Sequence, residues 1–202
     1  MSYMIQQIFV IHGGDAYSNY EEYLEALRSK RVSLERLRSQ DWKANLPKAL
    51  GSDFDILLPR MPNGQNAKYL EWKIYFEKLV SLMESGVVLI GHSLGGIFLA
   101  KYLSEETLPI QVRATLLVAA PFNTPEIHPL ADFVLSADLG MFAEQGGDIT
   151  LYHSSDDQIV PFSNLNDYRR ALPNARFVTF TDRGHFNAAE FPELVADLQA
   201  LS

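Results

Sequence analysis

The chain has 202 residues, of which 47% are hydrophobic and 21% charged, and it contains no cysteine. This length and balance predict one globular domain, residues 1–202, with a full-sized core. The formal net charge of −8 argues against a nucleic acid or an anionic membrane surface as a partner. Without cysteine, disulfides, cysteine-ligated zinc and a thiol nucleophile are excluded.

Targeting and membrane-spanning signals are not found in the sequence. Residues 1–4 lead into a short strand candidate without the basic and apolar regions of a signal peptide. No apolar run approaches the roughly 18 residues that a membrane span requires. We therefore expect a cytoplasmic protein with no membrane span.

Six apolar runs of strand length recur along the chain, separated by segments with helical spacing. Several of them lack polar alternation, as strands do when both faces of a parallel sheet are covered. The alternation predicts an α/β protein whose doubly wound, mainly parallel sheet of about six strands is flanked by helices. The strand candidates are residues 5–11, 54–58, 87–90, 112–118, 149–153 and 176–180.

Two segments depart from simple alternation. Residues 20–50 are charged and helical in spacing, which predicts two helices broken near Val32 and Ser33, with Gly51 as a stop signal. Residues 121–147 mix prolines and glycines with apolar side chains between two strands, which suggests a cap over a pocket.

The most informative motif is Gly91-His92-Ser93-Leu94-Gly95, which follows an apolar strand candidate and precedes a helical pattern. A G-x-S-x-G sequence in that setting is typical of a nucleophile elbow, the sharp strand-to-helix turn that presents a serine hydroxyl at the edge of a sheet. The two glycines allow the strand and the helix to pack closely around the serine. Ser93 is therefore the candidate nucleophile.

A serine hydroxyl is a poor nucleophile and needs a histidine base that a carboxylate orients. In a sheet of this kind the acid and the base follow later strands, in the order Ser, Asp, His. Asp156 and Asp157 follow the strand candidate at 149–153, and His185 follows the one at 176–180. The three candidates therefore meet at one edge of the sheet, where ligands bind in such folds.

The two neighbouring aspartates leave a choice. We favour Asp157 as the acid because it precedes the Val160-Pro161 pair by three residues, while Asp156 is more simply a turn residue that bonds its local backbone. Asp182 lies three residues from His185 in one loop and fits a capping or surface role better.

An oxyanion hole needs two backbone N–H donors. One is expected at Leu94, which follows the nucleophile at the start of a helix whose dipole favours negative charge. The other is expected in the loop His12-Gly13-Gly14 after the first strand. We favour Gly14 as this donor, with Gly13 as the alternative and His12 as the residue that fixes the loop.

The substrate pocket is expected to include His12 and Gly13, together with Phe122, Phe133 and Phe142 from the 121–147 segment. These aromatic rings favour an apolar acyl or alcohol group, although they could instead anchor the segment to the core.

Two other histidines have simpler interpretations. His92 is expected to pack or to hydrogen-bond beside the nucleophile. His153, near Asp156 and Asp157, suggests a metal site only weakly, because no second cluster of ligands accompanies it. We therefore expect no metal and no cofactor.

These motifs resemble the small serine hydrolases of the α/β-hydrolase superfamily that include retinoblastoma-binding protein 9, over nearly the whole chain. The resemblance implies a shortened α/β-hydrolase fold and a serine hydrolase activity on simple esters, with Ser93, Asp157 and His185 at the triad positions. Without cysteine the chain has no L-x-C-x-E motif, so retinoblastoma binding is not implied. The matching segments are residues 12–14, 61–63, 91–95, 155–161 and 182–186.

These observations predict a serine hydrolase, of the carboxylesterase type, that cleaves a small carboxylic ester through an acyl-enzyme. Two alternatives stay open: a thioester, amide or peptide hydrolase with the same triad, and a hydrolase-like binding protein with little turnover. The long 20–50 segment could reshape the rim of the pocket or contact a partner. No sequence feature predicts an oligomeric state.

Overall fold

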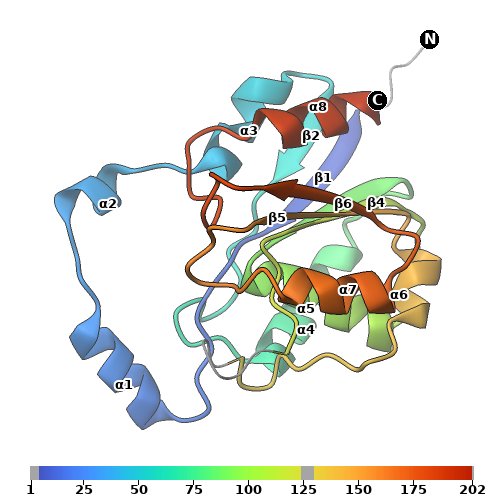
Figure 1. Cartoon of the computed structure of the whole chain (residues 1–202). Helices are drawn as coiled ribbons and strands as arrows, with labels where there is room; N and C mark the ends of the chain where they lie inside the picture. The colour runs from blue at the N-terminus through green and yellow to red at the C-terminus, as the bar shows by residue number, and fades with distance from the viewer. Residues whose placement is uncertain (1–4, 124–129, 202) are drawn as a thin grey trace.

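The computed structural model of the chain describes residues 5–123 and 130–201. Its centre is a six-stranded sheet in the order β2-β1-β3-β4-β5-β6, and every neighbouring pair of strands is parallel (Figure 1). The strands are β1 (Gln6–Ile11), β2 (Phe54–Leu57), β3 (Val87–His92), β4 (Val112–Val118), β5 (Asp148–Ser154) and β6 (Arg176–Phe180).

The predicted α/β class and all six strands are confirmed. The main difference is in β3, which continues beyond residue 90 through Gly91 and His92. The extension is stabilised because Gly91 pairs with Ile11 on one side and His92 pairs with Val118 on the other. The strand therefore runs up to the residue that precedes Ser93.

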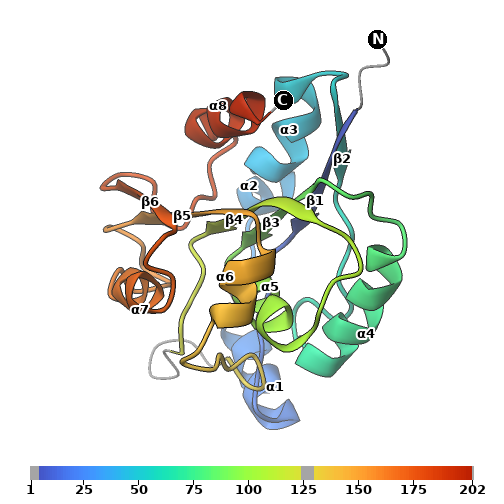
Figure 2. The ribbon, with the colours of Figure 1, turned by 90° about the vertical axis from the view of Figure 1, so that its right-hand side faces the viewer.

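Helices cover both faces of this sheet, α3 and α8 on one face and α4 to α7 on the other (Figures 1 and 2). None of the helices in the described part of the chain is long and apolar enough to cross a membrane. The helices are α1 (Tyr20–Ser29), α2 (Leu34–Arg38), α3 (Trp42–Leu50), α4 (Tyr69–Val80), α5 (Leu94–Glu105), α6 (Gly140–Gln145), α7 (Asn164–Ala171) and α8 (Pro192–Ala200).

Alternate residues of the central strands belong to two separate apolar cores. In β1, Ile8 and Val10 join the core under α3 and α8, while Phe9 and Ile11 join the core under α4 to α7. Both faces of the strand are thus removed from water, which explains why the apolar runs in the sequence show no polar alternation.

The 20–50 segment forms three helices, so the prediction of two is wrong. The predicted break at Val32 and Ser33 is present, between α1 and α2. The second break falls before α3, where the Asp41 carboxylate accepts a hydrogen bond from the N–H of Lys43 and caps the helix. Gly51 ends α3 with φ of 77°, a conformation that favours glycine.

Only α3 of this segment packs on the sheet. Its buried residues Trp42, Leu46 and Leu50 enter the core beside α8. In α1 no residue is buried, and Figure 1 shows α1 and α2 extending away from the body of the protein.

The 121–147 segment, predicted as a cap, leaves β4 and returns to β5 through α6. Its Leu130, Phe133 and Leu139 are buried and join the core under α4 to α7. Residues 124–129 of this segment lie outside the described residues. A covering role over a pocket stays a prediction.

The topology places the ends of β1 and β3 next to each other, where the strand order reverses. From β1 the chain passes to β2 at one edge, whereas β3 leads on to β4, β5 and β6 on the other side. At such a reversal of strand order, a crevice opens beyond the carboxyl ends of the strands. Ile11 pairs with Gly91 there, so the segments that follow both strands lie side by side.

Candidate active site

Ser93 occupies a strained turn between β3 and α5. Its φ is 54° and its ψ is −121°, a left-handed conformation that costs a non-glycine residue of order 1–3 kcal/mol. Two hydrogen bonds of 2.8 Å hold the turn: the Ser93 N–H donates to the carbonyl of Val118, and the Ser93 carbonyl accepts from the N–H of Gly96. Such strain, maintained by neighbouring contacts, is typical of functional positions.

The glycines on either side of Ser93 are required by close backbone contacts. A Cβ on Gly91 would lie 2.5 Å from the carbonyl oxygen of Gly95. A Cβ on Gly95 would clash with the carbonyl oxygens of Ile11 and His12, at the end of β1. Any larger residue would push the elbow away from the neighbouring strand and loop, so the geometry accounts for the spacing of the motif.

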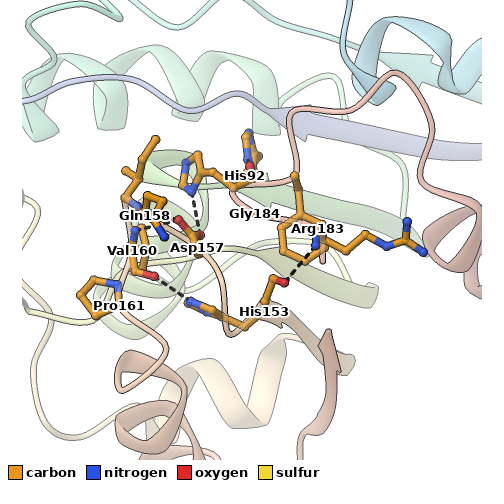
Figure 3. Close-up of polar contacts among 12 residues, drawn as sticks. His92, His153, Asp157, Gln158, Val160, Pro161, Arg183 and Gly184 are labelled. Atoms are coloured by element: carbon orange, nitrogen blue, oxygen red, sulfur yellow. Dashed lines mark hydrogen bonds and ion pairs between the residues drawn. The ribbon is translucent and has the colours of Figure 1, made fainter. Parts of the chain in front are cut away.

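His185 and Asp157 form a buried pair. Nδ1 of His185 lies 2.9 Å from Oδ2 of Asp157, and the two side chains are 9% and 0% exposed. The other carboxylate oxygen of Asp157 accepts hydrogen bonds from the N–H groups of Ile159 and Val160, at 2.8 and 3.0 Å (Figure 3). Because the carboxylate accepts from Nδ1–H, the Nε2 atom of the neutral ring keeps its lone pair free to accept a proton.

Asp156 faces a different part of the site. Its Oδ1 atom accepts hydrogen bonds from the Ser154 hydroxyl, at 2.5 Å, and from the Gly184 N–H, at 2.9 Å. The Ser154 hydroxyl in turn accepts from the N–H of Arg183 (Figure 3). The hydrogen bond from Ser154 lowers the pKa of Asp156. Of the two candidate acids, Asp157 therefore contacts the histidine, and Asp156 holds the loop that leads to it.

The elbow and the histidine loop meet through His92. Its Nε2 atom lies 2.9 Å from the carbonyl oxygen of His185, and the centroids of the two rings are 5.0 Å apart. Within residues 5–123 and 130–201, no hydrogen bond joins the Ser93 hydroxyl to His185. Contacts between nucleophile and base are often long without substrate and tighten in the substrate complex.

The glycine loop after β1 runs beside the elbow. A Cβ on Gly13 would lie 3.0 Å from Cβ of Ser93, and one on Gly14 would lie 3.4 Å from the Leu94 side chain. The N–H groups of Gly13, Gly14 and Leu94 donate no hydrogen bond to any other described residue. All three therefore stay candidate donors to a substrate oxygen atom.

His12 fixes this loop, as expected from the sequence. Its Nε2 atom accepts a hydrogen bond from the Met61 N–H at 2.9 Å, so Nδ1 carries the proton and donates to the Gly13 carbonyl at 2.5 Å. The ring also packs edge-on against Trp72. A contact between His12 and substrate stays a prediction.

The three phenylalanines proposed for the pocket have different surroundings. Phe133 and Phe142 are 0% exposed within the core, where Phe133 packs against Trp72. Phe122 is partly exposed, and its ring packs edge-on against Tyr168. Of the three, Phe122 therefore has surface available for a ligand, and a pocket role for any of them stays a prediction.

His153 is buried and hydrogen-bonded within the protein. It is 1% exposed, and its Nε2 atom lies 3.0 Å from the carbonyl oxygen of Val160 (Figure 3). Burial lowers the pKa of His153, which keeps the ring neutral. No cluster of three metal-ligating side chains occurs among the residues that the structure describes.

Sequence reasoning missed one residue of this region. Lys43, in the first turn of α3, reaches the elbow, with its Nζ atom 3.1 Å from Nδ1 of His92. Only the capping signal of Asp41 marked the start of α3, and nothing distinguished Lys43 from the many other charges between residues 20 and 50.

The parallel sheet, the strained serine at its switch point and the buried His–Asp pair define an α/β-hydrolase-like protein. The crystal structure of YdeN from Bacillus subtilis superimposes with a TM-score of 0.76 and 21% identity, covering 97% of this chain and 98% of that one. This similarity confirms the predicted α/β-hydrolase fold.

The family model described as serine hydrolase matches residues 33–195, and the chain belongs to that family. Serine hydrolase RBBP9 of Rattus norvegicus is 26% identical over 165 residues, which cover 73% of this chain and 78% of the relative. The YdeN sequence of Bacillus subtilis is 25% identical over 185 residues, covering 91% and 87%. The resemblance to small α/β-hydrolase serine hydrolases is thus confirmed.

Proposed function

We propose that this serine hydrolase cleaves a small carboxylic ester through an acyl-enzyme, with Ser93 as nucleophile, His185 as base and Asp157 as the orienting acid. The observation that carries the proposal is the buried hydrogen bond between His185 and Asp157 next to the strained Ser93 turn. A carboxylate on Nδ1 leaves Nε2 as the proton acceptor, which is the arrangement that a serine nucleophile requires.

In the first half of the reaction, Oγ of Ser93 attacks the ester carbonyl carbon while its proton passes to Nε2 of His185. The tetrahedral intermediate then collapses, the bond to the alcohol breaks, and His185 returns the proton to the leaving oxygen. In the second half, His185 takes a proton from water, the resulting hydroxide attacks the acyl group, and Ser93 is released with its proton restored. Asp157 stabilises the imidazolium in both halves.

The oxyanion of each tetrahedral intermediate is held by backbone N–H groups. Leu94 supplies one donor at the start of α5, where the helix dipole favours negative charge. Gly14 supplies the second, with Gly13 as the alternative. Each donor of this kind contributes about 2.7–4 kcal/mol to transition-state stabilisation.

The substrate's apolar part is assigned to the side of the site under the 121–147 segment, which acts as a cap. Phe122 supports this assignment because it follows closely after the end of β4 and is partly exposed. A short acyl or alcohol chain would pack against that ring.

A fluorophosphonate probe tests the proposal directly. We expect covalent labelling at Ser93 that is lost in Ser93→Ala and His185→Ala, while Ser81→Ala, at an exposed serine, labels like the wild type. A series of nitrophenyl esters, with matched thioesters and anilides, then identifies the bond that is cleaved. A folded wild type that neither reacts with the probe nor turns over any member of the series would rule out the proposed mechanism in favour of a binding role.

A further inference from the structure

The loop after β6, which carries His185, is held by the first turn of α3. The Trp42 indole N–H donates to the carbonyl of Phe186, and the Trp42 backbone N–H donates to the carbonyl of Ala188, both at 2.9 Å. The Asn45 side-chain amide donates to the carbonyl of Ala189, also at 2.9 Å. Two residues of one helical turn thus bind three carbonyls of the loop.

The backbone on both sides of His185 is in the left-handed conformation. Gly184 has φ of 50° and Phe186 has φ of 52°. Phenylalanine adopts this conformation only when its surroundings impose it. The hydrogen bonds from α3 bind the residues that directly follow His185 in this strained loop.

His92 provides a further contact, directly on the carbonyl of His185. That carbonyl can only accept, so the His92 Nε2 atom 2.9 Å away carries a proton and donates it. On the other side of the ring, the Lys43 ammonium can only donate, so the His92 Nδ1 atom 3.1 Å away must keep its lone pair. Both neighbours therefore select the same neutral tautomer of His92.

The charges around His92 reinforce this selection. Its ring is 4% exposed and faces Lys43 from α3, His185 from the loop after β6 and His12 from the loop after β1. Burial first, and then Lys43 and His185, lower the pKa of His92 well below its ordinary value. A proton on Nδ1 would point at an ammonium group, so the ring stays neutral.

Lys43 is itself held in a fixed position. Its Nζ atom lies 2.5 Å from Oδ2 of Asp41 and 4.9 Å from the centre of the Trp42 ring. The Lys43 side chain is 12% exposed. This is a buried, oriented ammonium group that points at the elbow rather than a solvated surface charge.

We propose that Lys43 and His92 are positioning residues for the ester hydrolysis assigned above. Lys43 holds His92 in the Nε2–H tautomer, and His92 holds the carbonyl of His185, so that the His185 ring stays aligned with Asp157 and Ser93. The inference rests on the proposed function, because it concerns the base of that reaction. Neither residue is assigned a contact with substrate.

Histidine NMR tests the first link without any activity measurement. In ¹⁵N-labelled wild type, His92 is expected as the neutral Nε2–H tautomer at pH 7, and it should take up a second proton only at a lower pH than an ordinary histidine does. Lys43→Met is expected to let the His92 ring take up a second proton, on Nδ1, at a higher pH than in the wild type, because the neighbouring ammonium is gone. Lys48→Met, at an exposed lysine of the same helix, is expected to leave the His92 signal unchanged. An Nδ1–H tautomer in the wild type, or an unchanged His92 signal in Lys43→Met, would overturn the proposal.

Kinetics with a nitrophenyl ester test the second link. Lys43→Met is expected to lower kcat about tenfold with KM nearly unchanged, because misplacement of the base slows the chemical step more than binding. The acid limb of kcat/KM should also become steeper, since His92 is then free to take up a proton. Adding His92→Gln should restore a single ionisation, because glutamine keeps a donor for the carbonyl and does not titrate.

The outcomes separate this proposal from the proposed function. A wild type that no fluorophosphonate labels overturns the ester hydrolysis itself. A labelled wild type with a Lys43→Met variant of equal kcat and equal pH profile overturns the positioning role alone. If circular dichroism shows that Lys43→Met does not fold, Lys43→Gln and Lys43→Glu provide the comparison, because only the glutamine can donate to Nδ1 of His92. We expect kcat to stay higher in Lys43→Gln than in Lys43→Glu. Wild-type kcat in both variants would overturn the positioning role.

Discussion

The Oδ2 atom of Asp157 lies 2.9 Å from Nδ1 of His185, and these two residues are 28 positions apart in the chain. The same carboxylate binds two backbone N–H groups of its own turn through Oδ1. One side chain thus orders the turn after β5 and orients the imidazole after β6.

We expect Asp157→Asn to lower kcat by about 10⁴ while the protein stays folded. The amide oxygen can still accept from the N–H groups of Ile159 and Val160, but the NH₂ group opposite Nδ1 favours the wrong tautomer of His185. Steady-state kinetics and circular dichroism measure the two effects. Asp182→Asn, with a side chain that is 74% exposed, is the control, and equal activity in Asp157→Asn and this control would contradict the assignment of the acid.

Gly14→Ala should lower kcat by about 10²–10³, the effect of losing one oxyanion donor. The new methyl group would clash with the carbonyl of Gly64 and displace the loop that presents the Gly14 N–H. Gly140→Ala is a suitable control, because the nearest atom to its new Cβ is the carboxylate of Asp138, a side chain that can move. Full activity in Gly14→Ala would leave Gly13 as the second donor.

Acid should destabilise the fold through His92 and His153. Burial lowers the pKa of both, so below about pH 6.5 the unfolded chain binds protons that the folded protein does not. The free energy of unfolding therefore falls as pH decreases, by up to about 1.4 kcal/mol per pH unit for each histidine. Urea unfolding of wild type and His92→Gln at pH 7.5, 6.5 and 5.5 measures this decline in the free energy of unfolding. The variant should show a shallower decline, and parallel curves would contradict this origin.

Phe122→Ala and Phe133→Ala should distinguish a residue that contacts substrate from one that only packs in the core. Phe133 is fully buried against Trp72, so its loss should cost about 3–5 kcal/mol of stability while the preferred ester chain length stays the same. Phe122 is partly exposed, so its loss should shift the chain-length optimum with a smaller effect on stability. Thermal unfolding and a nitrophenyl ester series supply both readouts. An unchanged optimum in Phe122→Ala would remove this residue from the pocket.

Much of the fold could be predicted because each strand is indicated by its own short stretch of sequence. Uninterrupted apolar runs such as residues 87–90 exist because both faces of the strand are buried, and the glycines beside Ser93 exist because backbone atoms approach closely there. Since the carboxyl ends of parallel strands lie at one edge of the sheet, the strand pattern alone predicts that the residues after each strand lie together.

The remaining features depend on contacts between distant segments, which leave little local trace. The second break in the 20–50 segment is marked only by the cap that Asp41 provides for α3. As an aromatic residue in the 121–147 segment, Phe133 could equally be a pocket or a core residue by its sequence, and the structure places it in the core. Lys43 is an ordinary charge in a charged segment until α3 is placed against the elbow.

The hydrogen bond from the Trp42 indole to the carbonyl of Phe186 joins positions 144 residues apart. Closing so long a loop has an entropy cost, so the hydrogen bonds that α3 makes to the loop after His185 form only once these two distant segments have been brought together. A refolding chain can therefore assemble most of its sheet and still be inactive. Recovery of turnover reports when the two distant segments meet, rather than when secondary structure appears.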